Sequence, residues 1–279
     1  MKPHTLIAVG TGIHVGHLTA EAREWLQSAE KVLYCVSDAA TERLILELNS
    51  SAESLYRFYG EGKRRTETYE QMIARTLEAV RLHETVVVAY YGHPGFFVYP
   101  SHQAVKLARE EGHEAFMAPA VSSFDCLIAD LGINIAGGCQ IFEATDLMMR
   151  QRRIDVAGHV VVLQVSSLGD VAYSRNGFDR RHVPSLGEYL LKIYPSDFMV
   201  KTYHAAQFSI AKPMIEEISV KQLATEKIKS ISTLYIPPMK TLPIYMKILK
   251  QYNLESLLDG KRLVPLNEEL DSELSNEKL

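Results

Sequence analysis

Short apolar runs alternate with amphipathic segments along the first part of the chain. The apolar runs predict β-strands, and the segments between them repeat their apolar positions at helical spacing. Strands that alternate with helices predict an α/β fold, a mostly parallel sheet with helices on its faces. Thr85–Tyr91 is apolar almost throughout, which is typical of a strand buried on both faces. The expected strands are Thr5–Val9, Lys31–Val36, Thr85–Tyr91, Glu114–Ala118 and His159–Val165, and the expected helices are Ala20–Ala29, Tyr69–His83 and Ser101–Glu111.

The pattern changes after about Val165. Arg175–Pro184 is polar and loop-like, and two further strand-like runs, Glu217–Ser219 and Ile231–Ile236, follow among helical pieces. We therefore expect two α/β lobes, the first over residues 1–166 and the second over residues 167–250. Residues 251–279 are expected to form a C-terminal helix and an acidic tail, and the acidic run Asn267–Leu279 is typical of a solvated end.

Composition and charge narrow the class of protein. The chain has 279 residues, 47% of them hydrophobic, which is enough for a sizeable core, and its formal net charge is −4. A nucleic-acid-binding protein normally carries a basic surplus, so we expect no nucleic-acid partner. No apolar run approaches membrane-spanning length and the N-terminus lacks the pattern of a signal peptide. We therefore expect a cytoplasmic protein with no membrane partner.

Cysteine and histidine spacing gives no sign of a metal centre. Cys35, Cys126 and Cys139 lie far apart, so they suggest neither a disulfide framework nor a ligand cluster and fit a reducing compartment. His14 and His17 are close in sequence, but no further ligand group lies near them. This favours a solvent-exposed pair over a metal site, and we expect no metal.

Three turns that follow predicted strands carry residues able to contact a ligand. Val9–Gly16 is rich in glycine but matches neither a Walker loop nor the dinucleotide fingerprint, and alone it is equally a plain strand-to-helix turn. Gly92–Gly95 is either a ligand-binding turn at the end of a parallel strand or a tight turn beside core aromatics. Ser122 and Ser123 either cap a helix or bond a ligand.

The order of these turns, with Ser232–Pro238 after them, resembles the tetrapyrrole methylase superfamily of class III S-adenosylmethionine methyltransferases. Over about residues 5–245 the resemblance implies two α/β lobes, with the cofactor S-adenosylmethionine in the cleft between them, usually in a homodimer. Many members carry Gly-Asp-Pro where this chain has Gly92-His93-Pro94, which argues against a porphyrinoid substrate. The residues that the resemblance assigns to the cofactor are Tyr91, His93, Phe96, Ser122, Gln164, Ala205, Ser232 and Thr233.

A polar loop that leads into a helix indicates the subfamily. Thr68 and Gln71 match a capping box, so Thr68 is the expected N-cap and Tyr69 opens the first turn. Taken singly, Tyr69 fits the start of a core stripe and Lys63–Arg65 fits a solvated charge run. The whole segment resembles the borosin-type peptide α-N-methyltransferases, whose active site has two tyrosines three apart, an arginine six later and a tyrosine four later. The matching residues are Tyr56, Tyr59, Arg65 and Tyr69.

The resemblance implies a demanding reaction. An amide nitrogen is a poor nucleophile because its lone pair is delocalised into the carbonyl. Methyl transfer to it needs loss of the N–H proton and stabilisation of the imidate oxygen. A predicted helix N-terminus and nearby positive charge both favour a phenolate. We therefore expect Tyr69 to act as the base and Arg65 to hold and polarise the substrate carbonyl, while Tyr56 and Tyr59 position the peptide or relay the proton.

The expected function is S-adenosylmethionine-dependent α-N-methylation of backbone amides in a ribosomally made precursor peptide. Because few residues follow Pro238 and they end in an acidic tail, we expect the precursor in trans. A leader domain would then dock on the homodimer, giving a heterotetramer with two precursors. The alternatives are a methyltransferase for a tetrapyrrole or other small molecule, and a catalytically inactive scaffold, against which the complete tyrosine–arginine set argues.

Overall fold

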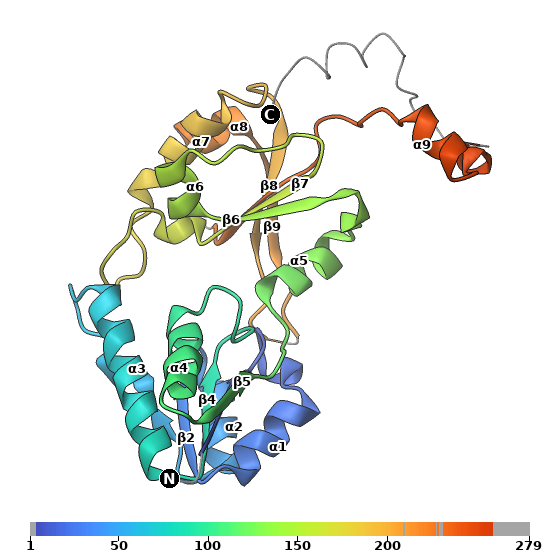
Figure 1. The fold of residues 1–279 in the computed structure, drawn as a ribbon. Helices are drawn as coiled ribbons and strands as arrows, with labels where there is room; N and C mark the ends of the chain where they lie inside the picture. The colour runs from blue at the N-terminus through green and yellow to red at the C-terminus, as the bar shows by residue number, and fades with distance from the viewer. Residues whose placement is uncertain (1–3, 209, 227, 229–230, 259–279) are drawn as a thin grey trace.

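A computed structural model describes residues 4–208, 210–226, 228 and 231–258, which form two α/β lobes, each built on a five-stranded sheet (Figure 1). The expected α/β architecture is therefore confirmed. The acidic run expected over Asn267–Leu279 lies outside the described residues. Within the described ranges, no helix combines the length and the apolar character needed to cross a bilayer.

The first sheet has five parallel strands in the order β3-β2-β4-β1-β5. Side chains that alternate along β1 and β4 enter two apolar clusters, so α3 and α4 cover one face while α1 and α2 cover the other. The strands are β1 (Thr5–Gly10), β2 (Lys31–Cys35), β3 (Glu53–Ser54), β4 (Thr85–Tyr90) and β5 (Glu114–Met117). The helices are α1 (Ala20–Ser28), α2 (Ala39–Leu48), α3 (Arg65–Leu82) and α4 (Tyr99–Glu110), with the short 3-10 turns η1 (Val15–His17) and η2 (Leu55–Phe58).

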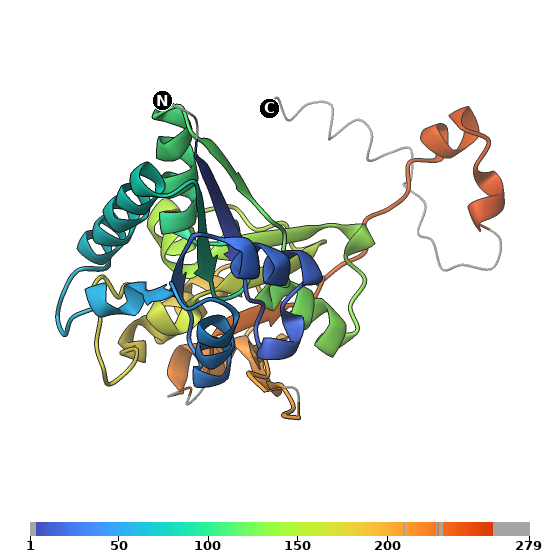
Figure 2. The same cartoon turned by 90° about the horizontal axis from the view of Figure 1, so that it is seen from below.

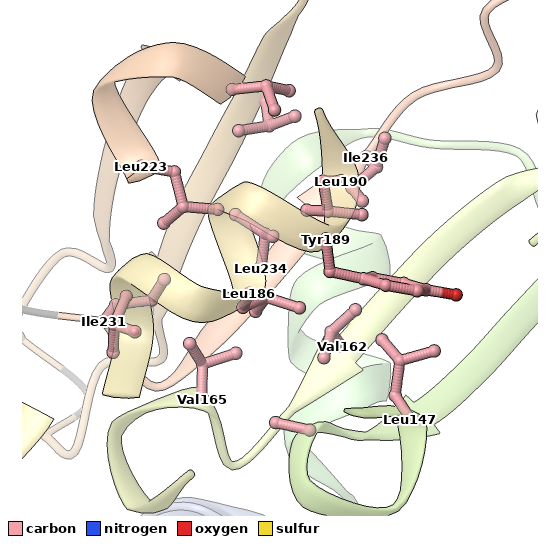
Figure 3. Close-up of a cluster of buried hydrophobic side chains, with 14 of the residues drawn as sticks. Leu147, Val162, Val165, Leu186, Tyr189, Leu190, Leu223, Ile231, Leu234 and Ile236 are labelled. Atoms are coloured by element: carbon pink, nitrogen blue, oxygen red, sulfur yellow. The ribbon is translucent and has the colours of Figure 1, made fainter. Parts of the chain in front are cut away.

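The second sheet has the order β6-β7-β10-β8-β9, in which β6 and β7 are parallel and the remaining pairs antiparallel. One face packs on α6, α7 and α8 through a buried cluster that includes Leu186, Leu223 and Leu234 (Figure 3). The strands are β6 (Cys139–Glu143), β7 (His159–Leu163), β8 (Met199–His204), β9 (Met214–Ser219) and β10 (Thr233–Ile236). The helices are α6 (Ala144–Arg150), α7 (Val183–Leu190) and α8 (Val220–Thr225), with 3-10 turns η3 (Ile135–Gly137), η4 (Val165–Ser167) and η5 (Arg180–His182).

The opposite face of the second sheet meets the first lobe through α5 (Ser123–Leu131). Leu127 of α5 packs in one cluster with Ile13, which follows β1, and with Val161 of β7. Figure 1 shows α5 in green between the lobes. Among the described residues, α9 (Met246–Gln251) and η6 (Glu255–Leu258) follow β10, and α9 stands away from both lobes in Figures 1 and 2.

Strand pairing corrects one expectation. The run His159–Val165, expected in the first lobe, forms β7 and pairs in the second sheet, and β6 beside it was not predicted. Every residue of β6 is only half-buried, so it lacks the apolar run that marks a strand in the sequence. The second sheet thus begins at Cys139, ahead of the lobe boundary expected near residue 167.

Gly187 allows α7 and α8 to pack closely. A Cβ atom on Gly187 would lie 2.4 Å from the backbone nitrogen of Ala224. We expect Gly187→Ala to push the helices apart and lower the free energy of unfolding by about 1–3 kcal/mol, as measured by urea denaturation. Gly137→Ala is the control, because a Cβ there meets nothing within 4 Å. Equal losses in the two variants would contradict the close approach of the helices.

Candidate functional site

A cavity of about 440 Å³ lies between the lobes, at the carboxyl ends of β4 and β7 and the start of α5. This is the edge of a parallel sheet at which α/β proteins bind ligands. The cavity brings together all eight residues predicted for the cofactor, together with Arg65 and Tyr69 of the predicted catalytic set. Tyr56 and Tyr59 do not line it. The cofactor-site candidates that line it are Tyr91, His93, Phe96, Ser122, Gln164, Ala205, Ser232 and Thr233.

The turns after β1 and β4 meet backbone to backbone beside this cavity. The Gly92 amide donates to the Gly12 carbonyl at 2.9 Å, and the Gly12 amide donates to the Gly92 carbonyl at 3.2 Å. A Cβ atom on Gly10 would lie 2.1 Å from the Gly92 oxygen. A side chain at Gly10 would keep the two turns apart, and their reciprocal hydrogen bonds hold them together. Gly92 and His93, in the second of these turns, line the cavity.

Two residues that line the cavity have a left-handed backbone although neither is glycine. Phe97 has a φ of 60° and Gln164 a φ of 58°. Such conformations are uncommon outside glycine, and they cluster at functional sites, where surrounding contacts hold them. At Gln164 the backbone leaves β7 and continues into η4, where the Val165 amide donates to the Ser232 carbonyl at 3.0 Å.

Several residues predicted to bind the cofactor also form hydrogen bonds that stabilise the fold. Ser122 caps α5 in a capping box, and its hydroxyl donates to Asp125 at 2.6 Å, so the capping alternative is confirmed while ligand contact stays a prediction. The Nδ1 atom of His93 accepts from the Gly95 amide at 3.0 Å and thereby shapes its own turn. The Ser232 hydroxyl donates to the Tyr203 carbonyl at 2.8 Å.

Helix α3 begins earlier than the sequence suggests. It starts at Arg65, and the Thr68 amide donates to the Arg64 carbonyl, so Thr68 lies inside the first turn and is not the N-cap. The expected capping box is therefore wrong: the Thr68 hydroxyl is buried and points to the Phe58 carbonyl at 3.3 Å. Tyr69 then lies beyond the first helical residues, where the helix dipole has little effect on a charge.

Arg65 occupies a position that the helix itself does not favour. A cation at the first residue of a helix faces the positive end of the dipole. The guanidinium carbon lies 5.1 Å from the centre of the Phe178 ring, and the buried Nε has no hydrogen-bond partner among the described residues. A buried donor without a partner is costly unless a ligand uses it, and Arg65 lines the cavity.

Tyr56 and Tyr59 form an aromatic cluster with a third tyrosine, Tyr173, which the sequence did not reveal. The Tyr59 ring centre lies 5.1 Å from that of Tyr56 and 5.0 Å from that of Tyr173. The hydroxyl oxygens of Tyr56 and Tyr173 are 2.8 Å apart, within hydrogen-bonding distance. Tyr173 belongs to the second lobe, so this cluster spans both lobes beside the cavity.

Burial opposes ionisation of two of the tyrosines. Burial is the main cause that raises the pKa of Tyr59. The hydrogen bond with Tyr173, and then burial, raise the pKa of Tyr56 to about 12. The neutral phenol is therefore the stable form at both positions near neutral pH.

An ion-pair network supports the turn that carries Tyr56 and Tyr59. The Glu53 carboxylate, on β3, accepts hydrogen bonds from Arg75 of α3 at 2.9 and 2.6 Å. Lys31 of β2 lies 3.0 Å from the same carboxylate, and Arg57 of η2 lies 2.6 Å from it. Arg75 first, and then Lys31, lower the pKa of Glu53 to about 2. The network joins two strands, a helix and the tyrosine-bearing turn.

Further cavity residues escaped the sequence reasoning. Glu143 is the last residue of β6 and Thr145 lies at the start of α6. The rule that ligands bind at the carboxyl ends of strands would have indicated both residues had β6 been predicted. The additional lining residues include Ser37, Glu143, Thr145, Asp170 and Phe178.

His14 and His17 differ from the exposed pair that was expected. Their ring centres are 3.6 Å apart, both residues are half-buried, and burial is the first cause that lowers the pKa of His17. In the part of the chain that the structure describes, no group of three or more His, Cys, Asp or Glu residues is arranged to hold a metal ion.

Comparisons of the sequence with known proteins point to one family. The family model of tetrapyrrole (corrin/porphyrin) methylases matches residues 5–191. The methyltransferase/ribosomally synthesized cyclic peptide dendrothelin A precursor of Dendrothele bispora is 40% identical over 266 residues, 93% of this chain and 63% of that protein. A methyltransferase/ribosomally synthesized type I borosin cyclic peptide precursor of Coprinopsis marcescibilis is 39% identical over 245 residues, 85% of this chain. The chain spans about 63% of the length of both relatives.

The fold of the chain is also similar to that of a solved structure. The structure of uroporphyrin-III C-methyltransferase from Thermus thermophilus, complexed with S-adenyl homocysteine, matches with a TM-score of 0.56. The match covers 83% of this chain and 90% of that one at 21% identity. Because identity is this low, the likeness concerns the fold alone.

Acid should weaken the fold through Glu53. In the folded protein the pKa of Glu53 is about 2, below its ordinary value of 4.5. The ion pairs of Glu53 therefore stabilise the fold fully at pH values above about 4.5. This stability is lost as pH falls from about 4.5 towards 2. We expect urea midpoints measured from about pH 6 to about pH 3 to fall less steeply in Glu53→Gln than in the wild type. Glu47→Gln removes an exposed carboxylate paired only with Arg43 and is the control. Parallel curves for wild type and Glu53→Gln would refute this role.

Proposed function

The chain belongs to the tetrapyrrole methylase family, and we propose that within it the chain is a borosin-type methyltransferase, which transfers a methyl group from S-adenosylmethionine to backbone amide nitrogens of a peptide. One observation carries the proposal. Arg65 and Tyr69 line the same cavity as the eight residues expected to hold the cofactor. Tyr59 lies close enough to Tyr69 and Arg65 for both to affect its pKa, and its ring packs on that of Tyr56.

The cavity fits a cofactor with aromatic, polar and charged parts. Its volume of about 440 Å³ lies within the usual range for a pocket that binds a small-molecule ligand. Tyr91 and Phe96 offer aromatic faces, and Glu143 and Asp170 offer carboxylates for a cationic group. When bound, S-adenosylmethionine supplies an electrophilic methyl group on its sulfonium sulfur. The residues of this chain then have to hold the peptide, remove one proton and exclude water.

Arg65 is suited to the carbonyl of the reacting amide. Its unpartnered donor lies in the cavity wall, and a cation there stabilises the negative oxygen that develops as the amide loses its proton. Phe178, stacked on the guanidinium, limits the directions in which Arg65 can turn. The electrostatic help is largest where water is excluded.

Tyr69 is the proposed base. Ionisation is opposed at Tyr56 and Tyr59, whose pKa values are raised, and Tyr69 is the tyrosine of the set that lines the cavity. The phenolate oxygen of Tyr69 accepts the amide proton as the new N–CH₃ bond forms and the S–CH₃ bond breaks. Tyr56 and Tyr59 remain neutral and position the peptide through hydrogen bonds and ring contacts.

We further propose that the peptide comes from a separate precursor, whose leader docks on a homodimer to give a heterotetramer with two precursors. The relatives are named as methyltransferases joined to cyclic peptide precursors, which supports a ribosomally made peptide as the substrate class. Every lining residue of the cavity lies between Ile13 and Thr233. The two lobes therefore supply all the residues proposed to hold the cofactor, together with Arg65 and Tyr69.

Removing the proposed base or the cation should abolish most of the activity but spare cofactor binding. We expect Tyr69→Phe and Arg65→Ala to lower the rate of peptide methylation by about 100-fold or more, because both act on the amide. The affinity for S-adenosylmethionine, measured by calorimetry, should stay within about twofold. Phe58→Leu, a neighbour outside the set, should be much milder. A variant that lost cofactor affinity but kept its turnover per bound cofactor would reverse the assignment.

A leader-bearing precursor should be methylated far better than its bare core peptide. Tethering through the leader raises the local concentration of the core at the cavity. Mass spectrometry should show additions of one methylene each, located by fragmentation on backbone nitrogens of the core. Equal activity on the bare core would refute leader docking. Methylation confined to a side chain, or transfer to a porphyrinoid offered in place of the peptide, would refute the proposed substrate class.

A further inference from the structure

A segment of the second lobe, Val171–Phe178, crosses to the first lobe and pairs with the loop that precedes α3. We call it the bridging segment. Figure 1 shows it on the left, where the yellow chain descends from the upper lobe to the start of α3, and Figure 2 shows the same two loops side by side. The Gly62 amide donates to the Tyr173 carbonyl at 2.9 Å, and the Tyr173 amide donates to the Lys63 carbonyl at 2.9 Å.

The pairing continues on both sides of this bond pair. The Arg65 amide donates to the Val171 carbonyl at 3.0 Å, which satisfies one of the free amides at the start of α3. The Arg175 amide donates to the Glu61 carboxylate at 2.7 Å. The backbone register between the lobes is thus set over several residues, and it determines which side chains of the bridging segment reach the tyrosine–arginine set.

Two side chains of the bridging segment reach that set. Tyr173 contacts both Tyr56 and Tyr59, with a hydroxyl–hydroxyl distance of 2.8 Å to the former. Phe178 lies over the guanidinium of Arg65. Three of the four residues proposed for catalysis therefore contact the other lobe.

We propose that Tyr173 is a positioning residue of the peptide site, which holds the Tyr56 phenol in one orientation through their shared hydrogen bond. The proposal rests on the proposed function. Tyr56 lies on a short 3-10 turn and the residue is 47% exposed, so burial alone does not immobilise it. The bond from Tyr173 supplies the missing constraint, and a phenol held in place orients a bound amide without a further loss of rotational freedom.

The effect of Tyr173 on ionisation points the same way. The hydrogen bond with Tyr173 is the first cause of the raised pKa of Tyr56. When Tyr56 donates its one phenolic proton in this bond, its oxygen stays available to accept a hydrogen bond from a substrate N–H. Tyr173 thereby separates the role of Tyr56 from that of the base, Tyr69.

The test is a double-mutant cycle on Tyr56 and Tyr173 in the full chain. Tyr173→Phe removes the hydroxyl but keeps the ring that packs on Tyr59. We expect kcat on the leader-bearing precursor to fall about 10- to 100-fold, with KM and cofactor affinity nearly unchanged. The double variant should be no slower than Tyr56→Phe alone, because the bond is already lost. Fully additive losses would overturn the proposal, since two independent structural contributions behave in that way. Tyr252→Phe, at an exposed tyrosine after α9, is the matched control.

A second measurement is independent of activity. In the full chain labelled with 3-fluorotyrosine, the ¹⁹F resonance of Tyr56 is identified by its loss in Tyr56→Phe. Tyr173→Phe should shift this resonance, and Tyr252→Phe should leave it in place. An unshifted Tyr56 resonance would overturn the positioning role whatever the activity. A shifted resonance in a protein that methylates no peptide would overturn the proposed function while the contact between Tyr173 and Tyr56 stands.

Discussion

The contact between Gly10 and the Gly92 carbonyl is the constraint on which the cavity depends. A side chain at Gly10 would overlap that oxygen, so the turns after β1 and β4 approach one another only because glycine stands there. Their reciprocal hydrogen bonds then fix the direction in which the chain leaves β4. Tyr91, His93 and Phe96 follow in that direction and form one wall of the cavity, which the second sheet closes from the other side.

Charge and burial give different proposed roles to the three tyrosines and the charged residues near the cavity. Burial and a hydrogen bond keep Tyr56 and Tyr59 in the neutral form, whereas Tyr69 faces the cavity. Arg65 stands at the unfavourable end of its own helix, and its buried Nε donor has no partner in the described part of the chain, a cost that a bound carbonyl would offset. Glu53 pairs with Lys31, Arg57 and Arg75 and so ties the tyrosine-bearing turn to the sheet.

Local sequence patterns predicted most strands of the first sheet. The features that the sequence did not reveal depend mostly on contacts between residues far apart in the chain. The strands β1, β2, β4 and β5 were all predicted from apolar runs. β1, β2 and β4 are mostly buried inside the parallel sheet, whereas β5 lies at its edge with only Ala115 buried. The half-buried strand β6 leaves no such pattern, and β7 was assigned to the wrong sheet because its neighbours lie far along the chain. Thr68 was misread as a cap because Arg64, which has no typical capping side chain, occupies that position. Tyr173 contacts Tyr56 across 117 residues of sequence, so no local signal could have revealed it.

The bridging segment also limits how this architecture can change. A hybrid made by joining the first lobe of one relative to the second lobe of another would contain every residue that acts on the amide. It would still need the backbone register between the loop before α3 and the bridging segment to match, with a hydroxyl placed opposite Tyr56. The two halves of the chain are therefore a matched pair, and substitutions at the Tyr56–Tyr173 contact have to be accommodated in both lobes at once.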